Sequence, residues 1–557
     1  MLGIERLHYH LFALLLLSFN ATSSPLWAQP PEYLGELTPI WRSQPVIGRW
    51  LSGGQGLVTI PEYLLDSSFP YQKRPYAKEV PFADHLLIVR LLGGWNTNLS
   101  IGEMSGSKDA DVAYRDETGK IRYRWNLLFG RLDPYINMGY SDLTLVLDNI
   151  PWDFPVEPST GKYGQTAPPG NMAEWRQFMR ELAEQLVSKY GKKTASRFRF
   201  RLGTECQHIN RFDGSQEQYT KLYIATLESV RSVLPDSKIG PCNHGGGKGN
   251  TARNNIDFAL FYQDVERQLV SNLGIVDFFP ISNYYIKEAA GSHIKRMLRR
   301  KEVNKWYWDI VTEEIAADAV PAREVHESGL IVKSNSGTLG GGGAEGAAWY
   351  LKTLIEMYQL GVSRVAHWPA LDRLNKKGGH LVLTDQGWVL SVLEHLVGGS
   401  MYLYADEEYG TYTIDKLLVQ KENAVYLIVS MSGNRSVETD VSVTVPEHLL
   451  PDRDEYNIKG VALTRRNSIC TIIKEDLVNK DALREGYKGE YSPCANIRKM
   501  MKRSGLRIVN DNWDKYQQHM VQSLTLWDAS ELAREDQGGL IFTTKMEAPS
   551  IQVFKVY

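Results

Sequence analysis

Residues 198–207 read Phe-Arg-Phe-Arg-Leu-Gly-Thr-Glu-Cys-Gln, a short strand-like run that ends in a loop carrying Glu205. A second run of this kind, Trp-Tyr-Trp-Asp-Ile-Val-Thr-Glu-Glu at 306–314, leads to Glu313. In a parallel α/β barrel, the loops after the carboxyl ends of the strands hold the reacting side chains. The two runs therefore predict a barrel with two carboxyl groups at its mouth.

The sequence between about residues 84 and 400 alternates short apolar runs with longer helical patterns. This alternation is what a (β/α)8 barrel requires. Strands are predicted at 85–91, 142–147, 198–204, 237–241, 275–281, 307–313 and 363–368, with a first strand near 46–51. Apolar residues at three- and four-residue steps predict helices over 172–190, 216–234 and 345–360.

After about residue 401 the sequence pattern becomes typical of β-strands. Short β-branched and aromatic runs at 402–404, 412–419, 424–430, 441–445 and 551–557 are separated by turn residues. They predict a C-terminal β-sandwich, in which the charged stretch 452–515 is an insertion. We therefore expect an α/β protein with a signal peptide at 1–28, a catalytic barrel at 29–400 and a β-sandwich at 401–557.

The N-terminus combines basic residues with the apolar run Leu11–Phe19 and a small residue at Ala28. The run is far shorter than the roughly 20 residues that a membrane-spanning helix needs. This pattern is typical of a secretory signal peptide, so we expect a secreted or periplasmic protein with no membrane span.

Composition limits the classes of partner. The 557 residues include 63 Lys plus Arg against 65 Asp plus Glu, so the chain has no net field that would attract nucleic acid. Cys470 and Cys494 lie in the same polar stretch and could close a loop in an oxidising compartment, while Cys206 and Cys242 suit buried thiols. None of the four cysteines shows metal-ligand spacing. We expect neither a metal nor an organic cofactor. The oligomeric state is left open.

Two carboxyl groups across a barrel mouth suit the hydrolysis of a glycosidic bond. The reaction needs a proton donor on the leaving oxygen and an anion at the anomeric carbon. Carboxyl groups about 5–5.5 Å apart give retention, whereas a wider gap admits a water molecule and gives inversion. Strand ends four and seven can reach the shorter distance, so the sequence favours a retaining hydrolase and leaves inversion as an alternative.

At this point the chain resembles glycoside hydrolase family 39, a family of clan A that includes β-xylosidases. The block from Glu-Trp-Arg-Gln-Phe at 174–178 to Lys-Ile-Gly-Pro at 238–241 is similar to the acid/base region of that family. Ile-Val-Thr-Glu at 310–313 looks like the nucleophile motif, and Val-Ala-His-Trp at 365–368 like the last strand. The resemblance implies that Glu205 is the acid/base and Glu313 the nucleophile. Glu314 is the rival for the second role, since only one of two adjacent residues can face the mouth.

Departures from the family concern the sugar contacts. Thr204 stands where an Asn is usual, Leu92 where a His is common, and Asn283 where a His would precede Tyr285. Lost polar contacts weaken binding of an ordinary xyloside, because such contacts tighten in the transition state. We therefore expect a polysaccharide or oligosaccharide substrate, with a modified or sulfated glycan among the candidates.

Further candidates follow from their position near strand ends. Each also has a structural alternative, as a core residue, a barrel anchor or a solvated loop residue. The candidates for substrate binding are Arg90, Trp152, Thr204, His208, His244, Asn283, Tyr285 and Trp368.

The sequence thus predicts an exported retaining glycoside hydrolase that acts by double displacement. A second hypothesis is a non-catalytic carbohydrate-binding or export-associated protein on an inherited glycosidase barrel, which the altered Asn and His positions motivate. The presence of both carboxylates favours the first.

Overall fold

The computed structural model describes most of two large sheets and of the helices around them. The described residues are 30–43, 85–88, 91–95, 108–137, 142–161, 163–245, 256–268, 276–290, 293–297, 308–309, 320–333, 339–340, 343–367, 374–375, 381–382, 385–433, 437–453, 455–485, 501–512, 514–516, 519, 527–536 and 538–557.

The first sheet is built from eight parallel strands, with two short antiparallel strands, β12 (His293–Met297) and β14 (Leu339–Gly340), at its margin in the described part of the chain. In chain order the parallel strands are β2 (Trp41–Ser43), β3 (His85–Ile88), β6 (Asp142–Leu147), β9 (Arg199–Leu202), β10 (Ile239–Gly240), β11 (Phe278–Ala290), β13 (Ala322–Lys333) and β15 (Arg364–His367). β15 pairs with β2, and a parallel bridge joins His244 to Ile281 between β10 and β11. The strands therefore follow one another through the sheet in their order along the chain.

Most of the predicted parallel strands are confirmed. They could be predicted because buried apolar runs with β-branched residues identify such strands from the local sequence. β6 matches its predicted bounds, and β3, β9, β10 and β15 lie within theirs. β11 starts at Phe278, inside the predicted range 275–281, but extends to Ala290. The first strand is an exception: β2 ends at Ser43, whereas the predicted range 46–51 lies outside the described residues.

The prediction of the seventh strand at 307–313 is wrong. Trp308 and Asp309, the two described residues in that range, are helical, and β13 occupies the place between β11 and β15. The aromatic residues suggested a strand because such residues are common in strands. β13 went unnoticed because its first half, Ala-Arg-Glu-Val-His-Glu-Ser, is too polar to read as a buried strand.

The predicted helices are confirmed. α5 (Met172–Tyr190) begins after Asn171, whose side chain accepts from the backbone N–H groups of Ala173 and Glu174. α7 (Gln216–Arg231) begins with a Ser215–Gln218 capping box, and α10 (Gly343–Gln359) is buried along most of its length. The other described helices are η3 (Lys108–Ala110), α4 (Trp125–Asn137), α6 (Lys192–Ala195), α8 (Phe258–Gln268), α11 (Asp385–Leu396), η5 (Glu447–Leu449), α12 (Ile469–Asn479), α14 (Arg503–Asp511) and η7 (Ser530–Leu532).

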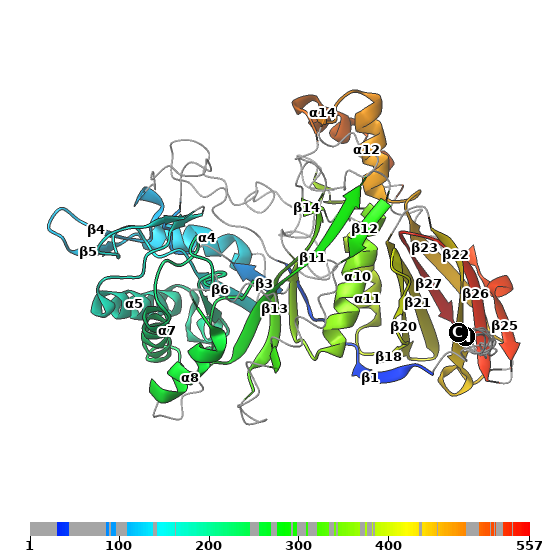
Figure 1. Ribbon diagram of the computed structural model, residues 1–557, viewed down its shortest axis with the longest axis horizontal. Helices are drawn as coiled ribbons and strands as arrows, with labels where there is room; N and C mark the ends of the chain where they lie inside the picture. The colour runs from blue at the N-terminus through cyan, green and yellow to red at the C-terminus, as the bar shows by residue number, and fades with distance from the viewer. Residues whose placement is uncertain are drawn as a thin grey trace, which may run out of the picture.

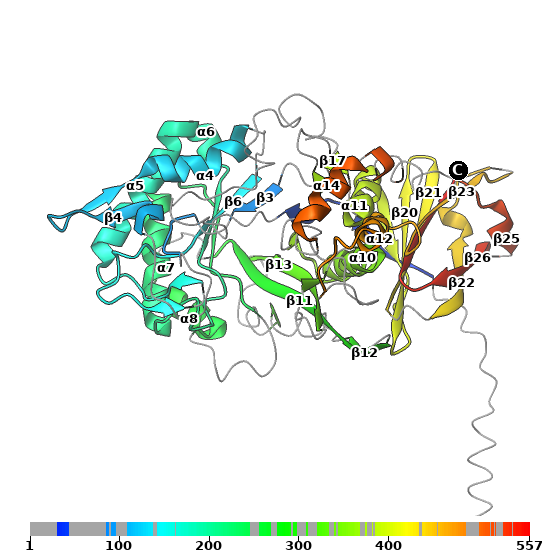
Figure 2. The same cartoon turned by 90° about the horizontal axis from the view of Figure 1, so that it is seen from above.

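Two views show how the helices surround the parallel strands. α5, α7 and α8 lie on one side of them, and α10 and α11 lie on the other side, toward the second large sheet (Figure 1 and Figure 2). The buried Lys352 of α10 pairs with Asp415 of that sheet, with a distance of 3.0 Å from Nζ to Oδ1. α10 therefore joins the two halves of the molecule.

The second half consists of two antiparallel sheets with an apolar core between them. One sheet contains β1 (Glu32–Glu36), β18 (Ser400–Leu403), β19 (Glu407–Glu408), β20 (Tyr412–Lys421), β21 (Ala424–Gly433), β23 (Ile458–Thr464), β24 (Trp527–Asp528) and β27 (Ser550–Val556). The other contains β22 (Glu438–Pro446), β25 (Ala533–Asp536) and β26 (Gly539–Glu547). Phe542 and Phe554 meet between them with ring centroids 5.3 Å apart. Because β23 pairs with β27 inside the sheet, residues 458–464 are not part of an insertion.

Short two-stranded sheets complete the described elements. They pair β4 (Ala113–Arg115) with β5 (Ile121–Tyr123), β7 (Thr160–Gly161) with β8 (Gly164–Gln165), and β16 (Leu374–Asn375) with β17 (Leu381–Val382).

Beneath the carboxyl ends of the parallel strands lies a buried ion-pair network centred on Glu324. Its Oε1 lies 2.5 Å from Arg199 Nη2, and its Oε2 lies 2.7 Å from His326 Nε2. Burial by itself would raise the pKa of Glu324, but Arg199, His326 and Arg364 together lower it to about 2. Because this network pairs the charge of Glu324, the polar strand β13 can lie between two other strands of the sheet.

We expect Glu324→Ala to destabilise the protein by about 3–5 kcal/mol, because it leaves buried cations without their partner. The pKa of Glu324 lies below its ordinary value of 4.5, so its stabilising effect is present above about pH 4.5 and is lost as the pH falls toward 2. Urea unfolding of the variant and the parent at pH 7 and pH 3 measures both effects. Glu217, which pairs with Lys221 and is 71% exposed, supplies the control. Glu324→Ala with an unfolding midpoint equal to that of Glu217→Ala would contradict the expectation.

Candidate active site

Glu205 lies in a tight turn directly after β9. Gly203 has a φ of 78°, and a methyl group there would come within 2.6 Å of Cys206 Sγ. Glu205 itself has a φ of 46°, a left-handed conformation that is costly for a residue with a side chain. Its N–H donates to Asn243 O at 3.1 Å, and its carbonyl accepts from His208 N at 2.9 Å. These bonds hold the half-buried carboxyl group at the end of the fourth parallel strand.

The carboxyl group of Glu205 is bound by Ser282, which is in turn bound by Asn243. Ser282 Oγ of β11 donates to Glu205 Oε1 at 2.9 Å. Asn243, which follows β10, donates from Nδ2 to Ser282 Oγ at 2.7 Å. A methyl group at Gly245 would come within 3.3 Å of both Glu205 Oε1 and His208 Nε2, so the backbone also passes close to this group.

Glu327 of β13 faces the same side of the sheet as Ser282 because of a β-bulge. The register pairs Ile281 with Val325 but Ser282 with Glu327, so His326 is an extra residue. In a regular strand, Glu324 and Glu327 would face opposite sides of the sheet. The bulge puts both on one face of the sheet and places a second carboxyl group beside the residue that binds Glu205.

The two hydroxyl groups of β11 each bind one carboxyl group. Tyr284, two residues after Ser282 and on the same face, donates to Glu327 Oε2 at 2.8 Å. Glu327 is only 6% exposed. One strand therefore positions both acids, Glu205 through Ser282 and Glu327 through Tyr284.

Opposing influences act on the charge of Glu327. Burial and the neighbouring charge of Glu205 raise its pKa, while Arg211, Arg201 and the Tyr284 hydroxyl act in the opposite direction. The guanidinium group of Arg211 lies 3.5 Å from the centre of the Tyr163 ring. The first two influences are the larger, so the pKa of Glu327 is raised above its ordinary value, and the two guanidinium groups limit the rise.

Three predicted site residues lie close to Glu205. Thr204 is buried and accepts from Arg201 Nη2 at 2.8 Å. His208 is half-buried, and burial together with Arg211 lowers its pKa. His244 is almost fully buried, and burial followed by the influence of His208 lowers its pKa to about 3. Both histidines are therefore expected to be neutral at pH 7.

Two other predicted residues are buried away from this centre. Trp152 is 6% exposed, and its Nε1 donates to Trp95 O at 3.2 Å. These contacts favour a role for Trp152 in the core over a role in binding substrate. Asn283 is 1% exposed and lies between Ser282 and Tyr284, so it faces the opposite side of β11.

The remaining predicted residues are not described. Arg90, Glu313, Glu314 and Trp368 lie outside the described residues. Tyr285 belongs to β11 by its backbone, but its side chain is likewise outside the description.

Sequence reasoning missed Glu327, Ser282, Tyr284, Asn243 and Arg211. The run Ile-Ser-Asn-Tyr-Tyr at 281–285 did draw attention, but Asn283 and Tyr285 were selected instead of the residues beside them. Because side chains alternate along a strand, an error of one residue exchanges the two faces. For Glu327 the available signal was a Glu-Ser pair within a polar run that did not resemble a strand.

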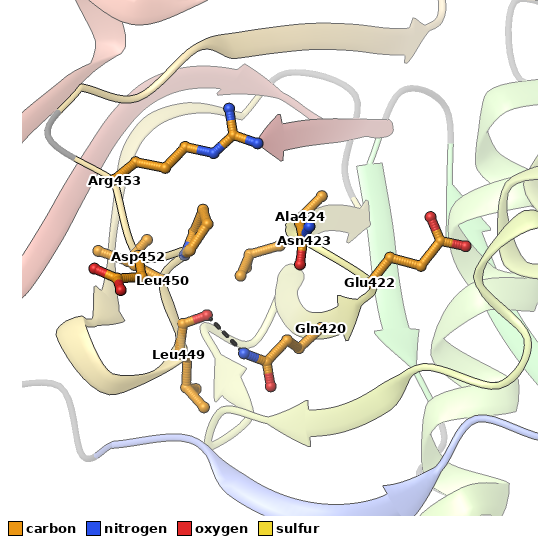
Figure 3. Close-up of a pocket in the computed structure, with 10 residues that line it drawn as sticks. Gln420, Glu422, Asn423, Ala424, Leu449, Leu450, Asp452 and Arg453 are labelled. Carbon is orange, nitrogen blue, oxygen red and sulfur yellow. Dashed lines mark hydrogen bonds between the residues drawn. The ribbon is translucent and has the colours of Figure 1, made fainter.

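A cavity of about 410 Å³ lies in the second half of the molecule, and its lining residues are distant in sequence from these carboxylates. Its lining includes Gln420 and Glu422 beside the β20–β21 turn and Leu449, Asp452 and Arg453 after β22 (Figure 3). Gln420 Nε2 donates to Leu449 O at 3.1 Å. Neither Glu205 nor Glu327 contributes to this cavity, so we place the chemistry at the strand ends.

The described cysteines are of two kinds. Cys206 and Cys242 are free buried thiols, and Cys470 is disulfide-bonded, while Cys494 lies outside the described residues. Within the described ranges, no group of three or more His, Cys, Asp or Glu side chains could hold a metal ion.

The comparison with known families covers Glu205 but ends before Glu327. The model of the glycosyl hydrolases family 39 matches residues 105–313. Over these residues the chain is similar to glycoside hydrolase family 39. This confirms the resemblance that its motifs indicated.

Two curated relatives match parts of the family 39-like chain. An α-1,4-L-rhamnosidase of Formosa agariphila is 27% identical over 223 residues, which cover 35% of this chain and 45% of that protein. A β-xylosidase of Caldicellulosiruptor saccharolyticus is 25% identical over 135 residues, which cover 24% of this chain and 28% of that protein. The chain therefore spans less than half the length of either relative.

The fold also has a solved counterpart. The structure of a monomeric β-xylosidase from Caulobacter crescentus CB15 has a TM-score of 0.59 at 13% identity, covering 94% of this chain and 97% of that one. The likeness shows an α/β fold with a mixed α/β domain and a sheet-rich domain. No helix in the described part of the family 39-like chain has the length and apolar character needed to cross a membrane.

Proposed function

We propose that this chain is a retaining glycoside hydrolase in which Glu327 is the nucleophile and Glu205 the general acid/base. The observation that carries the proposal is that β11 binds both carboxyl groups, through Ser282 and Tyr284 at positions two residues apart. The acids stand on the fourth and seventh parallel strands, and the charge of Glu205 raises the pKa of Glu327, so their closeness supports the short separation of a retaining enzyme.

The proposed reaction is a double displacement. Tyr284 holds Glu327 Oε2, so Oε1 attacks the anomeric carbon while Glu205 gives its proton to the leaving oxygen. Water then attacks the glycosyl-enzyme, losing a proton to Glu205, and Glu327 leaves as a carboxylate. Arg201 and Arg211 support the charge of Glu327 before attack and after release.

Glu327 takes the role that the sequence assigned to Glu313. The seventh parallel strand is β13, and Glu327 is the acid on this strand that lies beside the partner of Glu205. We further propose that the eight parallel strands form a (β/α)8 barrel within residues 29–400, and that residues 401–557 form the accessory sandwich, with β1 crossing to it.

The substrate class is proposed from the relatives. Their names make α-L-rhamnosides and β-xylosides the first glycosides to test. The altered position at Thr204 favours a modified or sulfated glycan. On the N-terminal sequence alone, we propose that the chain is exported and meets this glycan as a secreted or periplasmic protein.

We expect the purified full-length chain to hydrolyse at least one glycoside in a panel of aryl glycosides and polysaccharides with retention at the anomeric carbon. NMR of the first-formed sugar anomer measures the stereochemistry, and mass analysis identifies the products. An inverted first product would replace double displacement with direct attack by water. Binding of a glycan without cleavage across the panel would instead favour the non-catalytic alternative.

A further inference from the structure

The hydrogen bonds around Glu205 form a closed ring across three strand ends. Glu205 N–H donates to Asn243 O at 3.1 Å, Asn243 Nδ2 donates to Ser282 Oγ at 2.7 Å, and Ser282 Oγ donates to Glu205 Oε1 at 2.9 Å. Asn243 thus holds the backbone of Glu205 directly and its side chain through Ser282.

We propose that Ser282 and Asn243 are positioning residues that fix which oxygen of Glu205 carries the catalytic proton. The inference rests on the proposed role of Glu205 as acid/base. Oε1 is the held oxygen, and Oε2 is the oxygen that exchanges a proton with the glycoside and with water.

The direction of each bond follows from the donors available. An amide nitrogen can only donate, so the bond from Asn243 Nδ2 occupies a lone pair of Ser282 Oγ. The single hydroxyl proton of Ser282 is then free to point at Glu205 Oε1. An oxygen that accepts this bond is a poor place for the proton, so the proton goes to Oε2.

The surroundings make the arrangement rigid. Asn243 is fully buried and Ser282 is 5% exposed, so water does not compete for their hydrogen bonds. Ser282 lies within the long strand β11, and its N–H donates to His244 O at 2.7 Å. A ring fixed to three strands holds the Glu205 rotamer more firmly than the left-handed turn alone, which is a strained conformation.

The test uses two aryl glycosides of the hydrolysed sugar that differ only in the leaving group. Acid catalysis matters for phenol, a poor leaving group, and little for 2,4-dinitrophenol, which departs without a proton. We expect Ser282→Ala to lower kcat/KM about 10- to 100-fold on the phenyl glycoside and less than about 3-fold on the dinitrophenyl glycoside. Asn243→Ala is expected to give the same pattern with a smaller loss, because Ser282 then lacks the donor that orients its hydroxyl.

Matched variants separate positioning from a structural role. Ser328→Ala removes another fully buried serine hydroxyl of the same sheet, which donates to Ala366 O at 2.9 Å and not to either carboxylate. We expect it to affect both glycosides equally. Ser282→Thr keeps the hydroxyl and is expected to restore much of the rate on the phenyl glycoside.

A double-mutant cycle decides the proposal. In a Glu205→Ala background, Ser282→Ala should cause no further loss, because the group that it positions is gone. A further loss of the same size as in the parent would overturn the positioning role. If Glu205→Ala itself shows no dependence on the leaving group, the proposed function fails; if only Ser282→Ala lacks that dependence, the positioning proposal alone fails.

Discussion

We expect Glu327→Ala to lower kcat about 10⁵-fold on every glycoside that the parent hydrolyses, whatever its leaving group. The variant lacks the only group that, in our proposal, forms the covalent bond to the anomeric carbon, and both steps of the reaction depend on that bond. Initial rates on a dinitrophenyl glycoside, with thermal unfolding as a check of the fold, measure the effect.

Added azide should identify the missing role. In Glu327→Ala, the small anion can enter the space left by the carboxylate and attack from that side in a single displacement. NMR should then detect a glycosyl azide of inverted configuration. A retained azide would place the nucleophile elsewhere.

Glu313→Ala and Glu314→Ala are the matched controls, because the sequence alone favours these two acids. Both variants should keep a rate close to that of the parent. If Glu313→Ala abolished hydrolysis while Glu327→Ala remained active, the assignment drawn from β13 would be wrong and the motif at 310–313 would hold the nucleophile.

The second large effect is expected for Glu205→Ala, and it depends on the leaving group. Loss of the acid should reduce kcat/KM about 10²–10⁴-fold on a phenyl glycoside but much less on a dinitrophenyl glycoside. With the activated substrate, release of the glycosyl-enzyme becomes slow because no base activates water. A burst of dinitrophenol followed by slow turnover should therefore appear in stopped-flow absorbance.

Azide distinguishes this variant from the nucleophile variant. Azide needs no base, so in Glu205→Ala it should attack the glycosyl-enzyme and restore turnover, with a glycosyl azide of retained configuration as product. A uniform loss on both leaving groups, without rescue, would remove Glu205 from the acid/base role.

Local pattern was sufficient for much of the parallel half of the molecule. α5 could be placed to the residue because Asn171 and Gly191 mark its two ends and its apolar residues recur with helical spacing. Glu205 could be found because it follows an apolar strand in sequence, and a residue at a strand end keeps that position in any parallel barrel. In both cases the information lies within a few neighbouring residues.

The second acid required information from distant residues. β13 is polar because Glu324 is neutralised by Arg199, which is far away in the chain and comes from β9. A strand stabilised by such ion pairs lacks the apolar alternation that identifies a strand locally. The aromatic run at 306–308 therefore resembled a strand more than the sequence of β13 did, although Trp308 is helical.

By itself, the sequence determined the family resemblance of the chain and the order of most strands and helices, and it pointed to Glu205 as a candidate acid. Only the tertiary structure decided which acid faces it and how both are held. The bulge at His326 puts Glu327 on the same face of the sheet as Ser282. The alternation of side chains along β11 places Ser282 and Tyr284 on that face, and Asn283 on the other. The physical reason is that strand register is set by pairing between distant segments, and a shift of one residue exchanges the faces.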